Sequence, residues 1–237
     1  TGKPNHLTVV HAAGQGNGNG GAMDHVAHEG LIKRIVAGHF NLAPKLGALV
    51  KSNAIEAYNL PQGTISQWFR AVGGRRPGLI TKVGLQTFVD PRLDGGKISS
   101  KSTEDLVELM NIDGEEYLRY KQFPINVAII RGTTADTVGN ISCEDEIASG
   151  EVLGIAQAAK ASGGIVIAQV KRIAEVGSIN PHLMRVPGLL VDYVVECSDI
   201  AKYHRQTDGS ILEPSFCGIT RKPLASLSKM KLDHLKD

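Results

Sequence analysis

Short apolar runs alternate with helical segments along most of this 237-residue chain, and this alternation limits the possible fold more than any other feature. Runs of strand length occupy residues 7–13, 33–37, 54–58, 116–120, 127–131, 165–170 and 189–196. The last two are too apolar for either side to face water. Helical patterns lie between the runs, at residues 43–51, 61–74 and 150–162. Strands alternating with helices predict an α/β fold with a mostly parallel sheet covered on both faces.

Two of these helices carry boundary signals. Thr64 and Gln67 have the spacing of a capping box, and Gly73-Gly74 follows as a stop. The helix at 150–162 has one apolar stripe, formed by Val152, Ile155, Ala156 and Ala159. Gly163-Gly164 then ends it. Residues 84–101 are predicted to form a long irregular loop, and loops of that length are often functional.

Charge and cysteine content exclude several classes of protein. The formal net charge is +2, and basic residues are dense only at 73–76 and 222–236, which argues against a nucleic-acid partner. No apolar stretch approaches the roughly 18 residues needed to span a bilayer. The cysteines are widely spaced and form no C-x-x-C pair, which argues against a disulfide framework or a zinc ribbon; they are Cys143, Cys197 and Cys217. We therefore expect a cytoplasmic protein that binds neither nucleic acid nor membranes.

A glycine-rich segment follows the first apolar run, and Gly16, Gly18 and Gly21 have the spacing G-x-G-x-x-G. In dinucleotide-binding proteins such a loop approaches the pyrophosphate, and an acidic residue ending the next strand binds the ribose. Here the next run ends at Gly38-His39 without an acidic residue. We therefore expect no NAD binding, and a dinucleotide-binding oxidoreductase is the weaker alternative.

Two clusters of ligating side chains have ordinary explanations. His25, His28 and Glu29 follow the order H-x-x-H-E, which is neither H-E-x-x-H nor H-x-x-E-H, so we expect no metal. Four carboxylates lie within residues 143–151, where paired carboxylates would suit acid–base chemistry. The simpler prediction is a solvated loop whose acidic groups favour the positive end of the next helix.

The segment YNLPQGTISQWFRAVGGRRPGLITKVGLQTFVDPR, residues 58–92, is more specific. Its Pro61-Gln62-Gly63-Thr64 precedes a helix that ends in Arg and small residues, and GLQTFVDPR follows. In these motifs the chain resembles family I CoA-transferases, especially the short-chain (acetate or propionate) type. The similarity continues in the family's order through HEGLIKRIVAGHF, DGEEYLRYKQFP, VAIIRGTTADTVGNIS, SGGIVIAQV and RVPGLLVDYVV. It implies a three-layer α/β/α sandwich in which residues 14–21 are the loop after an early strand.

The resemblance also implies a reaction. Family members move CoA between a short-chain acyl-CoA and a carboxylic acid by ping-pong chemistry, with CoA as a substrate and no further cofactor. A glutamate attacks the thioester, and an enzyme–CoA thioester follows from the mixed anhydride. This glutamate lies in an E-x-G-x-x-G-like segment of the family's second half. Glu175-Val176-Gly177 begins that pattern, but Asn180 replaces the next glycine, and Glu29-Gly30 and Glu151 fit no better.

We therefore expect residues 1–237 to be an N-terminal CoA-transferase domain that contains no catalytic nucleophile. The resemblance implies that the first strand–helix unit and the C-terminal catalytic half are absent, so the isolated chain should be inactive. It also implies assembly with that second half and a homo-oligomer. The other class that remains open is a stand-alone structural or binding domain.

Gln62 and Gly63 are the predicted binding residues of this chain. A side-chain amide donates N–H to a substrate oxygen without adding charge, and a helix N-terminus adds backbone donors. The resemblance implies that Gln62 contacts the acyl or carboxylate group, whereas the alternative role is a turn residue that starts the helix. Gly63 is expected to be small so that the thioester can approach. Asp90 and Arg92 are predicted to hold the long loop by an ion pair.

Overall fold

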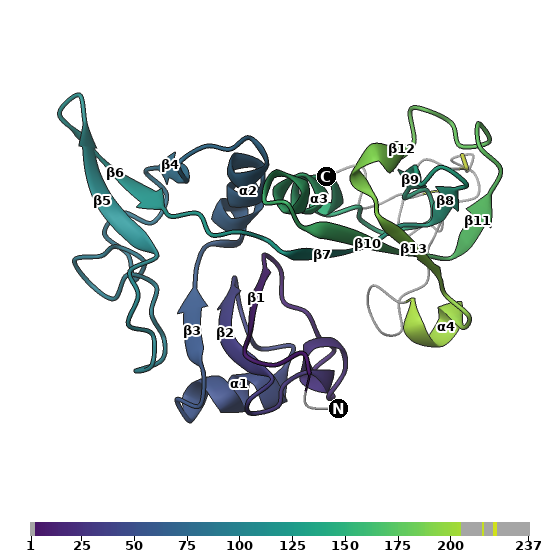
Figure 1. Ribbon diagram of the computed structural model, residues 1–237. Coiled ribbons are helices and arrows are strands. Elements are labelled where there is room, and N and C mark those ends of the chain that lie inside the picture. The colour runs from purple at the N-terminus through teal and green to yellow at the C-terminus, as the bar shows by residue number, and fades with distance from the viewer. Residues whose placement is uncertain (1–2, 205–214, 216–219, 222–237) are drawn as a thin grey trace, which may run out of the picture. The chain divides into compact units, whose positions relative to one another are not determined.

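A computed structural model describes residues 3–204, 215, 220 and 221 (Figure 1). The chain divides into two compact units. Unit 1 comprises Thr1–Ile130 and Glu151–Val166, and unit 2 comprises Arg131–Gly150 and Ile167–Asp237. Among the described helices, none is long and apolar enough to cross a membrane.

Unit 1 is built around a parallel sheet of β1 (Leu7–His11), β2 (Ile32–Ala37) and β3 (Glu56–Asn59), in that order. The helix α1 (Pro44–Lys51) covers one face, where a core forms from residues that include Ile35, Ala37, Leu46 and Ala57. The opposite face, with Val10 and Val36, lies against the helix α2 (Gln62–Gly73). Helix, parallel sheet and helix therefore form the predicted three layers within this unit (Figure 1).

The start of α2 differs from the prediction. The helix begins at Gln62, with Pro61 (φ −58°) at the N-cap and no side-chain cap. Thr64 therefore lies inside the first turn and is buried, so the predicted capping box is wrong. Proline explains the earlier start, because its fixed φ already suits a helix entry.

Helix α2 ends at the glycines, as predicted. The residue in the left-handed conformation that terminates it is Arg75, however, and not a glycine. Arg75 takes the left-handed conformation (φ 53°) and donates its N–H to the Val72 carbonyl at 2.9 Å. The Arg76 N–H reaches the Ala71 carbonyl, also at 2.9 Å. These two bonds make a Schellman motif with arginine where glycine is usual.

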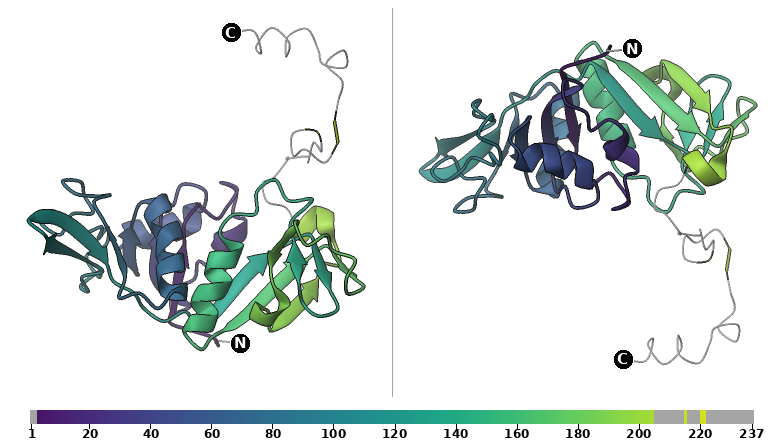
Figure 2. Two further views of the ribbon diagram at one scale, coloured as in Figure 1. Left: turned by 90° about the horizontal axis from the view of Figure 1, so that it is seen from above. Right: turned by 90° about the horizontal axis from the view of Figure 1, so that it is seen from below.

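The helix α3 (Val152–Ala161) confirms the pattern seen in the sequence. Ala156 and Ala159 of the predicted stripe are fully buried, and Gly163 (φ 74°) follows the helix end. It lies beside α2 in both views of unit 1 (Figures 1 and 2). Val152 and Ile155 are half-buried at the edge of this contact.

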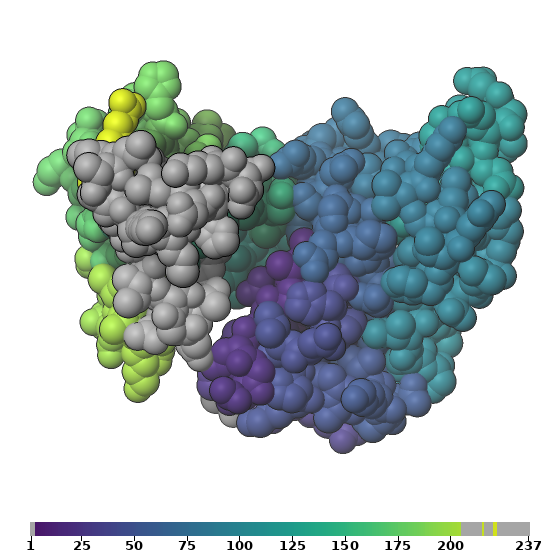
Figure 3. All heavy atoms as spheres, turned by 180° about the vertical axis from the view of Figure 1, so that it is seen from behind, coloured from purple at the N-terminus to yellow at the C-terminus, as the bar shows by residue number. Residues whose placement is uncertain are grey.

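A second sheet of unit 1 is antiparallel, with β4 (Leu79–Thr81), β6 (Glu115–Tyr120) and β5 (Val107–Ile112) in that order. The run at 116–120 predicted β6 but not its neighbours. Asp113 (φ 53°) and Gly114 (φ 84°) form the turn of the β5–β6 hairpin, which projects from unit 1 (Figures 1 and 3). An Asp-Gly pair between alternating residues is a hairpin signal that would have revealed β5.

Unit 2 contains a mixed four-stranded sheet in the order β11 (Arg172–Ala174), β8 (Thr134–Asp136), β9 (Ile141–Ser142) and β12 (Met184–Val186). The chain passes between the units within β7 (Val127–Arg131) and within β10 (Ile165–Val170). The short helix α4 (Ile200–Tyr203) follows the last strand.

The last predicted strand is partly wrong. The strand was predicted over residues 189–196, but its first two residues belong to a 3-10 turn, η2 (Gly188–Leu190). The strand β13 covers only Tyr193–Glu196. The Gly188 N–H donates to the Asn140 side chain at 2.8 Å, which turns the backbone away from a strand path.

One face of the parallel pair β10–β13 carries exposed side chains. Ala168 and Val170 on β10 are fully buried, as expected. On the other face Tyr193, opposite Ile167, is 58% exposed, and Val195, opposite Gln169, is 50% exposed. The expectation that neither side of these strands faces water is therefore wrong for this face.

Candidate functional site

The carboxyl ends of β1, β2 and β3 meet at one edge of their sheet, and α2 begins at the same edge. In parallel α/β sheets this is the edge at which ligands bind. A polar side chain lies at or just after the end of each strand: His11 ends β1, His39 follows β2 and Asn59 ends β3. These three were not predicted from the sequence. Their signal was a polar residue at the end of each short apolar run.

Gln62 and Gly63 occupy the first turn of α2, and both are exposed. The first backward helical bond runs from the Ile65 N–H to the Pro61 carbonyl at 3.0 Å, and no side chain caps the earlier N–H groups. A Cβ added to Gly63 would meet no atom within 4 Å. The helix start therefore presents backbone donors, the positive end of its dipole and open space.

The Gln62 side chain rests on the backbone of Gly38. A Cβ at Gly38 would lie 2.2 Å from Cγ of Gln62 and 2.3 Å from the Ala12 carbonyl oxygen. Asn59 fixes the same backbone, because its side-chain amide donates to the Gly38 carbonyl at 2.6 Å and to the Ala37 carbonyl at 3.0 Å. The site thus combines one residue from α2 with the ends of β2 and β3.

Two histidines lie beside this edge, and hydrogen bonds to the backbone determine which nitrogen of each ring carries the proton. His11 Nδ1 is 2.6 Å from the Ala13 carbonyl oxygen, so this nitrogen carries the proton and donates it. Gly14 donates its N–H to Nε2 of His39 at 3.1 Å, so that nitrogen accepts. Burial lowers the pKa of His11, the Ala13 bond opposes this change, and His39 adds to the lowering. The neutral form of His11 is therefore favoured.

The glycine-rich segment is the loop after β1, as the resemblance implied. It leads into a four-residue 3-10 turn, η1 (Ala22–His25), and not into an α-helix. A dinucleotide loop delivers the pyrophosphate to an α-helix N-terminus, which this segment does not provide. His25, His28 and Glu29 are exposed, and the described residues contain no group of three side chains suited to a metal.

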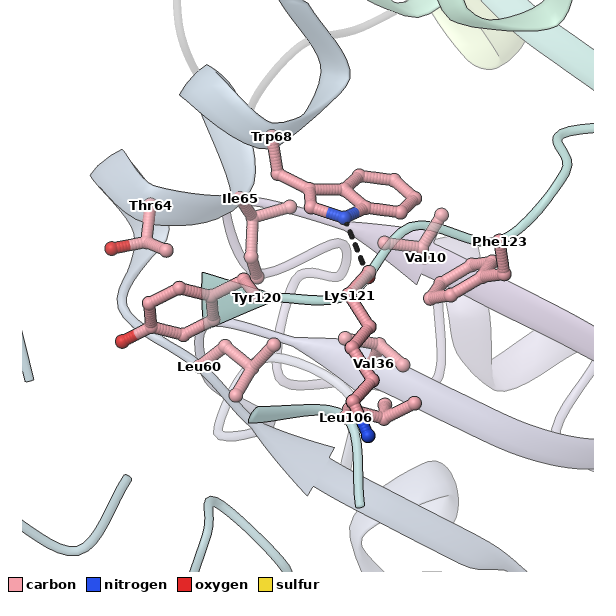
Figure 4. A pocket seen from close by; sticks show the side chains of 10 residues that line it. All are labelled: Val10, Val36, Leu60, Thr64, Ile65, Trp68, Leu106, Tyr120, Lys121 and Phe123. Carbon is pink, nitrogen blue, oxygen red and sulfur yellow. Dashed lines mark hydrogen bonds between the residues drawn. The ribbon is translucent and has the colours of Figure 1, made fainter. Parts of the chain in front are cut away.

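A pocket lies under α2, on the buried side of the helix (Figure 4). Trp68 donates Nε1–H to the Lys121 carbonyl at 2.9 Å, and the Tyr120 hydroxyl donates to the Val83 carbonyl at 2.8 Å. Burial raises the pKa of Tyr120 to about 12. The walls are mostly apolar and do not include Gln62 or Gly63, so this space is a gap in packing, separate from the helix start.

The predicted ion pair of Asp90 and Arg92 is confirmed. Arg92 Nη2 lies 2.7 Å from Oδ2 of Asp90, whose carboxylate also accepts the Gln86 N–H at 2.9 Å. Residues 84–101 contain no helix or strand, as predicted. This loop runs along β3: Asn59 donates its N–H to Gly96 at 2.8 Å, and Ile98 donates to Ala57 at 3.0 Å.

The acidic segment at 143–151 is not the solvated loop that we predicted. Glu146 is buried, and Arg131, Lys171 and His204 contact its carboxylate at 3.0, 3.2 and 3.1 Å. Glu144 and Asp145 both pair with Arg172. The basic partners lie far away in the sequence, so local composition alone suggested solvent exposure.

The chain is similar to known proteins over most of its length. A sequence profile described as Coenzyme A transferase matches residues 4–197. Caffeate CoA-transferase of Acetobacterium woodii is 46% identical over 236 residues, which are 100% of this chain and 45% of that protein. Acetate CoA-transferase YdiF of Escherichia coli K12 is 40% identical over 192 residues, covering 81% of this chain and 36% of that protein.

A solved structure agrees with these sequences. The acyl-CoA transferase YdiF of E. coli O157:H7, as a thioester complex with CoA, aligns with a TM-score of 0.87 and 36% identity, covering 100% of this chain and 45% of that one. This chain thus spans less than half the length of the relatives that it matches. By its sequence profile, its relatives and its fold, the chain belongs to the coenzyme A transferase family.

Proposed function

We propose that the whole protein transfers CoA between an acyl-CoA and a carboxylic acid, and that this chain supplies the oxyanion-binding part of the site. The observation that carries the proposal is the uncapped start of α2, where Gln62 and Gly63 are exposed beside the carboxyl ends of three parallel strands. Family membership supports the reaction class, and the local chemistry supports the role of this edge.

Each acyl transfer in such a reaction places negative charge on a carbonyl oxygen. A carboxylate attacks the thioester carbon, the C–S bond breaks, and CoA leaves as a thiolate while a mixed anhydride forms. The thiolate then attacks the enzyme's carbonyl in the anhydride, which releases the first acid and leaves an enzyme–CoA thioester. The Gln62 amide and the N–H groups of the first turn of α2 are suited to stabilise the charge in each step. CoA acts as a substrate, and no further cofactor takes part.

We assign the nucleophilic glutamate to a second half of the protein, outside these 237 residues. The positions of two of the three partial matches, Glu29 and Glu151, support this. Glu29 precedes β2 and so lies at the opposite end of that strand from Gly38, and Glu151 pairs with Arg70 at 3.3 Å. The chain, on this proposal, is an N-terminal domain of the protein and is inactive alone.

Two surfaces suit the remainder of such a protein. β1 is an edge strand of its sheet, and no described strand pairs with its outer side, whereas the loop at 96–98 covers the outer side of β3. The apolar face of β10 and β13 is uncovered, and parallel sheets are normally covered on both faces. We propose that the second half of the protein covers this face, within a homo-oligomer.

We propose acetate or propionate as the acid. The acetate CoA-transferase relative supports a small acid, and the caffeate CoA-transferase relative makes an aromatic acid the alternative to test. A cytoplasmic setting suits the two described cysteines, Cys143 and Cys197, which are free. Burial, with a contribution from Glu146, raises the pKa of Cys143 to about 11, so its thiol is poorly nucleophilic. Cys217 lies outside the described residues.

The decisive experiment uses the whole protein, incubated with acetyl-CoA or caffeoyl-CoA and with labelled acetate, propionate or caffeate. We expect exchange of CoA between acids and an intact-protein mass increase equal to a CoA thioester. Hydroxylamine should remove that adduct. Hydrolysis without exchange, or exchange without any covalent adduct, would contradict the proposal.

A further inference from the structure

We infer that Gly38 and Asn59 are positioning residues that hold the Gln62 amide in its working orientation. The inference rests on the proposed function of Gln62, and it concerns residues that do not themselves touch the reacting atoms. Gly38 and Asn59 act through contact with Gln62 and with the backbone beneath it.

Because Gly38 has no side chain, it leaves room for the Gln62 side chain. A Cβ at this position would be 2.2 Å from Cγ of Gln62, far inside van der Waals contact, and 3.2 Å from its Cδ. Any larger residue at 38 has to push Gln62 away or displace the Ala12 carbonyl, which a Cβ would approach to 2.3 Å.

The backbone at Gly38 is held on both sides, so it cannot easily move to relieve such a clash. Its N–H donates to the Ala12 carbonyl at 3.1 Å, on the β1 side. Its carbonyl accepts the Asn59 amide at 2.6 Å, on the β3 side, and the same amide reaches the Ala37 carbonyl at 3.0 Å. Asn59 lies just before Leu60, Pro61 and the start of α2. Its side chain therefore links the end of β2 to the segment that leads into α2.

This arrangement matters because Gln62 is exposed. An exposed glutamine is free to adopt many rotamers, and ordering one costs conformational entropy. A donor stabilises an oxyanion best when it is already fixed at the place where charge develops. The fixed Gly38 backbone supplies that order on one side of the Gln62 side chain.

A double-mutant cycle in the whole protein tests the inference. Gln62→Ala is expected to lower kcat by about 10²–10³ with little change in KM, as for loss of one oxyanion donor. Gly38→Ala should lower kcat to a similar extent. The double variant should be no slower than Gln62→Ala, because a displaced amide and a missing amide have the same effect. Gly47→Ala is the matched control, since a Cβ at Gly47 meets no atom within 4 Å, and it should retain wild-type kcat.

Asn59→Ala is the second variant, in case Gly38→Ala folds poorly because of the Ala12 carbonyl. It should lower kcat in the wild-type background and leave it unchanged in the Gln62→Ala background. Equal losses in both backgrounds would show that Gly38 and Asn59 act independently of Gln62 and would overturn the inference. A wild-type protein without CoA transfer would instead refute the proposed function. In that case a crystal structure of Asn59→Ala still decides: Gln62 keeping its contact with Gly38 would disprove the positioning role.

Discussion

Asp90 and Arg92 form a multidentate ion pair two residues apart in the loop between β4 and β5. The carboxylate is 1% exposed and accepts both Nε and Nη2 of Arg92, at 3.0 and 2.7 Å. The remaining guanidinium nitrogen, Nη1, reaches Glu116 on β6 at 2.9 Å. One buried acid thus fixes a loop and ties it to the neighbouring sheet.

Asp90→Asn should destabilise the chain by about 1–3 kcal/mol, because the buried position loses its charge and one of its two acceptor oxygens becomes an NH2 group that faces N–H donors. Chemical denaturation of purified residues 1–237 measures this. Asp105→Asn is the control: Asp105 pairs with Lys97 but is 72% exposed, so its change should stay within about 0.5 kcal/mol. Equal losses in the two variants would contradict the structural role of Asp90.

Lowering the pH from 7 should reduce the stability of the wild type by more than it reduces the stability of Asp90→Asn. Hydrogen bonds from Arg92 hold the pKa of Asp90 well below its usual range, with the Gln86 and Arg92 N–H groups adding to this and burial opposing it. The contribution of Asp90 is complete above its unfolded pKa of about 4 and is lost as pH falls below that value. Melting temperatures between pH 7 and pH 2 test this, and parallel pH profiles for the two proteins would disprove it.

Gln62→Ala should leave the fold of the chain almost unchanged, within about 0.5 kcal/mol, because the side chain is exposed and caps nothing. Turnover of the whole protein should nevertheless fall by about 10²–10³. The measurement is kcat per folded active site together with the melting temperature. A lowered melting temperature with normal turnover would assign Gln62 to helix entry alone.

Gly63→Ala separates stability from function at the same helix start. The new methyl group meets no atom within 4 Å, and alanine favours a helix by up to about 1 kcal/mol over glycine. We therefore expect a higher melting temperature and, in the whole protein, a higher KM for acyl-CoA as the methyl enters the space for the thioester. Unchanged kinetics would show that the open space beside Gly63 is not used by the substrate.

Tyrosine nitration tests whether the face of β10 and β13 is covered in the whole protein. In residues 1–237 alone, Tyr193 should react readily while the buried Tyr58 and Tyr120 do not. In the whole protein Tyr193 should react as slowly as those two. Protection of Tyr193 in the short chain that rises with its concentration would point to a second copy on this face. Equal reactivity in both proteins would refute coverage altogether.

Periodicity and the family motifs predicted the three parallel strands β1, β2 and β3 and the three longer helices of this fold, but not the parallel pair β8 and β11 of unit 2. These elements bury residues close in sequence, so local patterns carry the information. The start of α2 was misplaced because Thr64 and Gln67 match a capping box by spacing, whereas Pro61 sets the backbone three residues earlier.

The site was only partly visible in the sequence. Gln62 stood out through its motif, but Gly38 and Asn59 gain significance only when β2 and β3 bring them to one edge of the sheet. The burial of Glu146 was likewise hidden, because its partners Lys171 and His204 lie far along the chain. Long-range pairing, which local composition does not encode, accounts for these failures.

The buried carboxylate of Glu146 also bears on how unit 2 folds. Its partners come from three separate segments, the most distant being His204, 58 residues away. Closing a loop of that length costs conformational entropy, and an unpaired charge resists burial, so burial of Glu146 depends on contact with its partners. Losing any one of them afterwards leaves the carboxylate short of a donor. Unit 2 should therefore unfold as a whole, because one buried carboxylate joins its distant segments.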